Sequence, residues 1–335
     1  MRIGKLSQAA LVRSVLRQIT HRREDVAQGP ALGRGYSALL SQEGTTVLAG
    51  APVVVRDTET AVLALHRTWN SIAAAGAVPI GAMISLMLPT SMEETDLKLL
   101  LQAMDETAGR CGTELLGGHT EVTDAVSFPI LCVTGVGKTA DVVLHGPHML
   151  QADQDLVVAG GIGLGAAAYL AKTQKEELLS QFSPDFIRSA AKFDRRYSVA
   201  ETAQLAIGCG AQAMQDVSEG GIFGALWEMA EGAGKGLDVS LRRIPVRQET
   251  IEICEYFGLN PYQILSTGSL LIGINDGVEL VRQLSEQGIE AAVIGKVTDK
   301  KERILRNGEE IRYLDKPQTD ELYRFFESVE KDRKE

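Results

Sequence analysis

Apolar residues recur along the first half of the chain with two different periods. Between residues 60 and 77 they stand three or four positions apart, which predicts a helix that Gly76 ends. The apolar residues on its inner face are Val62, Leu65, Trp69 and Ile72. Residues 80–88 instead form an unbroken apolar run that Pro89 ends, which predicts a strand.

A second helix is predicted between this strand and the next. Ser91 and Glu94 stand three positions apart, as in a capping box at a helix start. Gly109 and Gly112 follow its apolar stripe, which consists of Leu97, Leu100, Leu101, Met104 and Ala108. A further apolar run at residues 128–137 predicts the next strand. Strand, helix and strand in this order predict an α/β fold with helices packed on a sheet.

The residues before this pattern read as a glycine-rich loop, 29–40, followed by a β-branched strand at 45–55. Backbone N–H groups in such a loop can bind an anion, and Arg34 would add positive charge. A lone glycine loop is weak evidence for a site. A short amphipathic helix is predicted ahead of the loop from apolar residues four positions apart, Leu11, Val15 and Ile19.

The second half of the chain repeats the alternation after a polar stretch. Residues 141–155 are polar and contain a Gly-Pro turn, so we predict two domains, 1–147 and 148–335. Strands and helices alternate again, and an Asn307-Gly308 turn predicts a hairpin. The last predicted element is a helix that carries Leu322, Phe325, Phe326 and Val329.

Composition and charge limit the class of partner. A chain of 335 residues with 44% apolar and 23% charged residues is typical of a globular protein with two domains. Its net charge of −10 disfavours nucleic acid and anionic membranes as partners. No apolar run is long enough to span a membrane. The cysteines are scattered without a C-x-x-C pair, so we expect a reducing, cytoplasmic location.

Two segments of the second half carry candidate ligand-binding residues. Gly161 and Gly163 follow a strand and open a helix, but the dinucleotide fingerprint is loose, and a tight turn explains small residues equally. Asp216 and Glu219 precede a second helix. They can either cap that helix or contact a substrate or metal ion.

The segment "LLGGHTEVTD", residues 115–124, raises the sharpest question about chemistry. Two glycines after an apolar run are typical of a backbone that admits a phosphate, yet His119 stands where such a loop usually carries a carboxylate. His119 can act as an acid or base near neutral pH, or it can be a packed histidine. Strand alternation predicts that Glu121 points to the same side as His119.

Four segments in this order resemble one enzyme superfamily, that of aminoimidazole ribonucleotide (AIR) synthetase. It also contains selenophosphate synthetase, thiamine-monophosphate kinase and the hydrogenase maturation protein HypE, and the HypE branch is nearest. The similar segments are "TWNSIAAAGAVPIGAMISLMLP", "LLGGHTEV", "DVSEGGIFGALWEMAEGAGKGLDV" and "IPVRQETIEICEYFGLNPYQILSTGSLLI". The resemblance covers nearly the whole chain from about residue 30 onward.

The resemblance implies a two-domain fold and an ATP site. The N-terminal α/β half would form a β-barrel-like interface in a homodimer, and a second α/β half would cover a cleft that binds ATP. The implied nucleotide-binding residues are Gly33, Gly35, Asn70, Gly117, Gly118, Thr120, Gly161 and Gly163. The candidate catalytic residues in these segments are His119, Glu121, Asp216 and Glu219.

The chain departs from the family at four acidic positions. The Asp-Asp-Ala-Ala loop is Gly35-Tyr36-Ser37-Ala38, and the Thr-Asp-Ser strand end falls near Ala49-Gly50-Ala51. The Asn-Asp pair is Asn70-Ser71, and Gly-Asp-Thr is Gly118-His119-Thr120. A site without these carboxylates binds Mg²⁺ poorly, because hard cations select charged oxygen ligands. Metal ligands are therefore unknown, with Asp57 as a further candidate.

Three functions remain open at this point. The protein can be an ATP-dependent enzyme that transfers or activates a phosphoryl group on a small molecule or partner. It can be a nucleotide-binding homologue without catalysis, or a structural partner in a maturation complex. HypE proteins react at a cysteine at the end of a mobile tail, whereas this sequence ends "FFESVEKDRKE", so we do not expect that reaction on its own tail.

Overall fold

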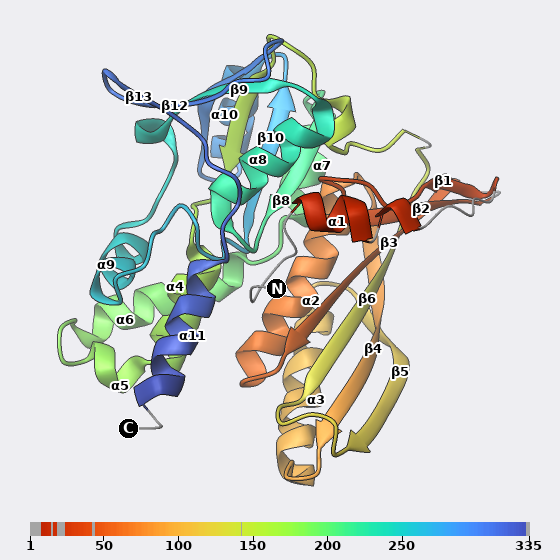
Figure 1. Ribbon diagram of the computed structural model, residues 1–335, viewed down its shortest axis with the longest axis vertical. Coiled ribbons are helices and arrows are strands. Elements are labelled where there is room, and N and C mark those ends of the chain that lie inside the picture. The colour runs from red at the N-terminus through yellow and green to blue at the C-terminus, as the bar shows by residue number, and fades with distance from the viewer. Residues whose placement is uncertain (1–7, 15, 19–23, 42–43, 142, 333–335) are drawn as a thin grey trace. The chain divides into compact units, whose positions relative to one another are not determined.

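The chain forms two compact units, each with its own sheet (Figure 1). This computed structural model describes residues 8–14, 16–18, 24–41, 44–141 and 143–332, with side chains to residue 329. The six-stranded unit comprises residues 23–29 and 35–144. The seven-stranded unit comprises residues 1–22, 30–34 and 145–335.

The sheet of the six-stranded unit is mixed, with strand order β1-β2-β3-β6-β4-β5. Only β4 and β5 are parallel, and β5 is an edge strand. The strands are β1 (Val26–Gln28), β2 (Tyr36–Ser41), β3 (Gly44–Val54), β4 (Val78–Pro89), β5 (Glu114–Thr123) and β6 (Ile130–Thr139). The outcome is the mixed α/β architecture expected from the alternating pattern.

Two helices cover one face of this sheet, α2 (Thr58–Ala74) and α3 (Glu94–Arg110). We call this covered face the inner face and the opposite one the outer face. The predicted inner residues of α2 are all buried, and Leu100, Met104 and Ala108 of α3 are buried with them. Hydrophobic burial of these two stripes stabilises the unit.

The apolar run 80–88 is confirmed as a strand, but only half of it is covered within the chain. Ile84 and Leu86 pack against the helices on the inner face, whereas Met83 and Met87 are 51% and 43% exposed. Alternate residues of a strand point to opposite faces. The outer face of β4 is therefore apolar and exposed.

Two expectations for this unit were wrong. The Ser91–Glu94 capping box does not form, because α3 begins at Glu94 after Glu93, which makes no side-chain cap hydrogen bond. The predicted loop 29–40 contains β2, which pairs with β3 from Tyr36 onward. The backbone groups of residues 36–40 are used in that sheet, so this part of the segment is not a free anion-binding loop.

The sheet of the seven-stranded unit has the order β13-β12-β9-β11-β7-β10-β8, and only β9 and β12 are parallel. Its strands are β7 (Asp155–Ala159), β8 (Ala213–Val217), β9 (Gly236–Ser240), β10 (Ser269–Ile274), β11 (Ala291–Thr298), β12 (Arg303–Asn307) and β13 (Glu310–Tyr313). The hairpin predicted at Asn307-Gly308 is confirmed, and Gly308 has a φ of +67°.

Helices cover both faces of this second sheet. Its helices are α1 (Gln8–Ser14), α4 (Leu164–Thr173), α5 (Lys175–Leu178), α6 (Pro184–Ala191), α7 (Ala200–Gly208), α8 (Gly221–Ala233), α9 (Gln248–Tyr256), α10 (Gly277–Glu286) and α11 (Glu321–Asp332). Leu156 and Val158 of β7 share a core with α8, whereas Val157 lies against Gly277 at the start of α10. Alternation along β7 thus places α8 and α10 on opposite faces. Of the apolar residues predicted for α1, Val15 and Ile19 lie outside the described residues.

The short segment 30–34 packs into the seven-stranded unit rather than with the strands that follow it. Gly33 has a φ of +68°, and a Cβ atom there would lie 2.5 Å from the carbonyl oxygen of Glu228 in α8. Glycine is required at this position because the two backbones approach so closely.

Candidate functional site

His119 and Glu121 lie side by side on the outer face of the edge strand β5. Their Nε2 and Oε2 atoms are 3.4 Å apart, and their side chains are 73% and 64% exposed. The alternation predicted for these two residues is confirmed. Both groups remain open to solvent and to a ligand or partner.

The neighbouring strands continue a polar row beside His119. In the sheet register His119 is opposite Ser85 of β4, and Ser85 is opposite Cys132 of β6. Paired residues of adjacent strands point to the same face. A histidine, a hydroxyl and a thiol therefore line one row of the outer face.

Gly117 and Gly118 are required by the geometry of β5. Their φ values are +124° and +145°, which side chains rarely adopt. The register shifts here, because Leu115 is opposite Ala82 while Gly117 is opposite Met83. A Cβ atom at Gly118 would collide with the backbone of Ile84. The glycine pair thus has a structural explanation, and its phosphate-binding role stays a prediction.

A second group of predicted residues comes together at α2. A Cβ atom on Gly35 would lie 3.4 Å from the hydroxyl oxygen of Ser71, and Asn70 beside it is 3% exposed. The loop position Gly35 and the helix position Asn70-Ser71 are thus neighbours, although 35 residues separate them. Their proximity is the arrangement that a shared ligand would need.

The two groups of the six-stranded unit do not meet. Gly35 leads into β2, and His119 lies on β5, with β3, β6 and β4 between them. Four strand spacings correspond to about 19 Å. Ser71 lies on a helix of the inner face, whereas His119 is on the outer face. One copy of the chain therefore does not bring His119 to Gly35.

Asp57, the further metal candidate, is the N-cap of α2. Its carboxylate accepts a hydrogen bond from the backbone N–H of Thr60 at 2.8 Å, and the Thr60 side chain completes a capping box. Capping accounts for the carboxylate of Asp57.

Thr120 of β5 is paired with Leu86 of β4, and both residues are on the inner face of the sheet.

The glycine turn after β7 uses its backbone donors within the unit. The N–H of Gly163 donates to the hydroxyl of Ser266 at 2.8 Å, and that of Gly160 donates to the carbonyl of Glu290 at 2.7 Å. A side chain at Gly163 would also contact Thr250. Gly163 is thus explained by a tight turn, while nucleotide binding at Gly161 and Gly163 stays a prediction.

The turn that carries Asp216 and Glu219 is tied to the C-terminal helix. Asp216 is on β8 opposite Leu270, and Glu219 precedes Gly220, whose φ of +87° begins α8. The backbone N–H of Gly220 donates to a carboxylate oxygen of Asp320 at 2.6 Å. Asp320, 100 residues further along the chain, thus bonds the backbone of the residue just before this helix.

Asp320 was missed by sequence reasoning. Its carboxylate also accepts from the N–H of Leu322 at 2.9 Å, and the residue is 3% exposed. Burial, with a smaller contribution from the nearby Glu219, raises the pKa of Asp320 to about 6. Backbone hydrogen bonds from Gly220, Leu322 and Leu265 lower the pKa but do not offset this rise. An aspartate just before a helix can be recognised in the sequence as a cap. No sequence signal marks Gly220 as its distant partner.

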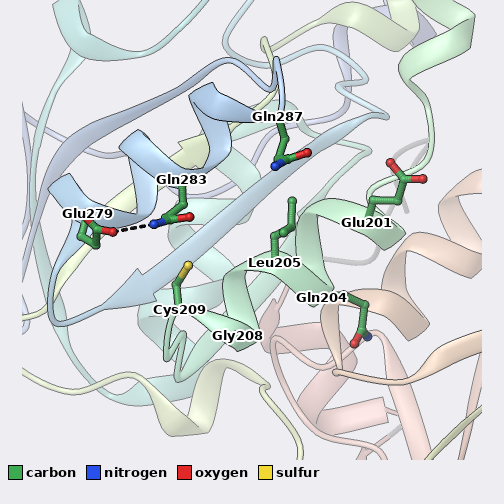
Figure 2. Close-up of a pocket in the computed structure, with 8 residues that line it drawn as sticks. All are labelled: Glu201, Gln204, Leu205, Gly208, Cys209, Glu279, Gln283 and Gln287. Carbon is green, nitrogen blue, oxygen red and sulfur yellow. Dashed lines mark hydrogen bonds between the residues drawn. The ribbon is translucent and has the colours of Figure 1, made fainter.

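A pocket lies elsewhere, between α7 and α10 (Figure 2). It has a volume of about 890 Å³ and is lined by Glu201, Gln204, Leu205, Gly208, Cys209, Glu279, Gln283 and Gln287. Hydrogen bonds from Arg282 and Gln283 lower the pKa of Glu279 to about 2. Since these lining residues include carboxylates and no basic side chain, the pocket is unsuited to a triphosphate.

The donor set does not fit Mg²⁺. None of Gly35, Ser71 and His119, the positions at which the resemblance implies acidic residues, offers a carboxylate. Across the part of the chain that the structure describes, no three His, Cys, Asp or Glu side chains gather closely enough to hold a metal ion. Hard cations need such charged oxygen ligands.

Two family models match the chain. The model for the AIR synthase related protein N-terminal domain matches residues 41–139, and that for the C-terminal domain matches residues 151–306. The chain belongs to the AIR synthase-related family. It is similar to the carbamoyl dehydratase HypE of Rhizobium leguminosarum bv. viciae, with 26% identity over 241 residues, 70% of this chain and 67% of the relative.

Solved HypE structures share the fold of this family member. HypE in a HypE–HypF complex has a TM-score of 0.72 at 19% identity, covering 92% of this chain and 100% of that chain. HypE in complex with ATP has a TM-score of 0.69 at 18% identity, covering 95% of this chain and 96% of that chain. The two-domain AIR-synthetase fold is therefore confirmed. No helix among the described residues is long and apolar enough to cross a membrane.

Proposed function

We propose that this HypE-like protein binds ATP in its six-stranded unit and uses it in maturation chemistry on a small molecule or a partner protein. The observation that carries the proposal is the closeness of Gly35 to Ser71, which are both in segments that resemble family motifs. ATP bound to a HypE neighbour of the same fold supports it further.

The ATP would bind without the family's Mg²⁺ ligands. Gly35 and Ser71 offer space, a backbone amide and a hydroxyl, which can hydrogen-bond a nucleotide but hold a hard cation poorly. Binding would therefore persist when divalent ions are removed. A basic group near the phosphates would replace part of the missing charge, and His119 is the candidate.

A second copy of the chain would supply that histidine. Within one copy, four strand spacings separate His119 from Gly35, so a histidine near the nucleotide would have to come from the partner of a homodimer. Exposed apolar side chains on the outer face support a homodimer interface, since Val54, Met83 and Met87 are each at least 40% exposed. The HypE–HypF complex supports a maturation partner as well.

A nucleotide-binding or scaffold homologue without catalysis is the second candidate. What favours it is that Gly35, Ser71 and His119 carry no carboxylate, at positions where the resemblance implies acidic residues. ATP turnover distinguishes the two, because a scaffold binds ATP without consuming it.

Calorimetry with ATP in Mg²⁺ and then in EDTA tests the proposal. We expect binding in both buffers and a loss of at least about tenfold in Gly35→Val, whose added methyl groups would enter the space beside Ser71. Gly29→Val is the matched control, because Gly29 is in the same unit and its added Cβ meets only Val26 at 4.0 Å. Binding only with Mg²⁺ would contradict the metal-free site, and no binding would overturn the proposal.

A further inference from the structure

Asp320 joins three segments that are distant in the sequence. One carboxylate oxygen accepts from Gly220 at the start of α8, and the other accepts from Leu322 in α11. Leu265, in the segment before β10, is a third backbone donor. The residue is only 3% exposed, so none of these hydrogen bonds is readily replaced by water.

Aromatic packing docks the rest of α11. Phe325 lies edge-on to Phe257 at 5.2 Å between ring centroids, and Phe326 lies edge-on to Tyr169 of α4 at 5.8 Å. Figure 1 shows α11 beside α4. Apolar packing thus holds the middle of α11, while the polar contacts of Asp320 hold its first residues.

We propose that Asp320 is a positioning residue that couples the Glu219–Gly220 turn to the docking of α11. Its two carboxylate oxygens bond the two elements at once, so neither can move without breaking a buried hydrogen bond. If α11 undocks, Gly220 loses its acceptor, and the turn that carries Glu219 is released. The docking of α11 therefore sets the position of Glu219.

The charges around Asp320 make this coupling sensitive to pH. Glu219 faces it from the turn before α8, Glu321 lies next to it in α11 with Arg324 paired to Glu321, and Cys254 faces it from α9. Asp320 has a pKa of about 6 when α11 is docked, above its ordinary value of 3.8. The docked state therefore holds a proton more tightly than the undocked state, and docking weakens as the pH rises from about 4 to about 6.

Amide hydrogen exchange tests the coupling in the full-length protein. After correction for intrinsic exchange rates, the opening equilibrium of Leu322 to Phe326 should rise about tenfold from pH 5 to pH 7. The Gly220 amide should open with the same midpoint. Asp320→Asn should remove this pH dependence at both places, because the side chain no longer titrates.

Two further variants separate coupling from simple docking. Glu219→Gln should make the pH dependence of opening shallower, since Glu219 raises the pKa of Asp320. This variant also keeps the proposal testable if Asp320→Asn fails to fold. Phe325→Ala should increase opening at every pH but keep the slope, because it weakens only the aromatic packing.

The proposal is overturned if Asp320→Asn keeps the slope, if Glu219→Gln leaves it unchanged, or if Gly220 stays protected while α11 opens. The exchange experiment needs no ligand, so it tests the coupling independently of the proposed function.

Discussion

The two regions that carry candidate acidic or basic residues, strand β5 and the turn before α8, differ in what surrounds them. On β5, His119 and Glu121 contact each other and are mostly exposed. Before α8, the acid that bonds the turn, Asp320, is almost fully buried and its carboxylate oxygens are occupied by backbone donors. Exposed groups are available to a ligand or a second protein, whereas the buried group determines shape. The same residue types thus serve different purposes in the two units.

The largest effect should come from the glycine pair of β5. Gly118→Ala would place a Cβ atom against the backbone of Ile84 at a φ of +145°, and we expect a loss of about 4 kcal/mol or more in the free energy of unfolding. Gly117→Ala is the control, because its φ of +124° is also positive but no atom lies within 4 Å of the added Cβ. It should lose only about 1 kcal/mol. Equal losses in urea denaturation would contradict this account of β5.

The proposed homodimer gives the next largest effect. Met87→Glu adds a charge to the apolar outer face, and we expect the dimer dissociation constant to rise about a hundredfold, measured by analytical ultracentrifugation. Val278→Glu is the matched control, since Val278 is 72% exposed in the seven-stranded unit. A dimer that tolerates Met87→Glu would show that the outer face is not the interface.

Asp320 should give a smaller effect that depends on pH. Its folded-state pKa of about 6 exceeds its unfolded value, so its contribution to stability is present at low pH and is lost as the pH rises to about 6. Between pH 4.5 and pH 7 the unfolding free energy of the native protein should fall by about 2 kcal/mol relative to that of Asp320→Asn. Urea denaturation at both pH values checks the difference, and a constant difference would rule out this titration.

The smallest effect on stability should come from His119. An exposed ion pair contributes little, so His119→Gln should change the unfolding free energy by less than about 0.5 kcal/mol. The same variant should weaken ATP binding about tenfold if a second copy brings His119 to the phosphates. A large loss of stability with unchanged ATP binding would contradict both the expected stability and the expected ATP affinity of His119→Gln.

Periodicity predicted the elements well because local spacing determines which side is apolar. The α2 face with Trp69 and the hairpin at Asn307-Gly308 depend only on neighbouring residues. The capping box at Ser91 failed because another helix start, after Glu93, was equally close. Strand β2 was missed because glycines before Tyr36 masked a short strand that long-range pairing stabilises.

The candidate sites were less predictable because they depend on contacts between distant residues. Alternation placed Glu121 beside His119, since both are on one strand. No local pattern could show that Asp320 reaches Gly220, or that Gly35 lies against Ser71. The fold makes these contacts, and only their residue types are visible in the sequence.

The close fit of Gly33 against Glu228 has a consequence for the order of events during synthesis. Gly33 leaves the ribosome long before α8 exists, and its packing surface is complete only after about 200 more residues have been added, which takes on the order of 10–40 s at ordinary translation rates. During that interval β2 and β3, which follow directly, can already pair. The segment around Gly33 must therefore wait unpacked beside a growing sheet, where a chaperone has time to bind it.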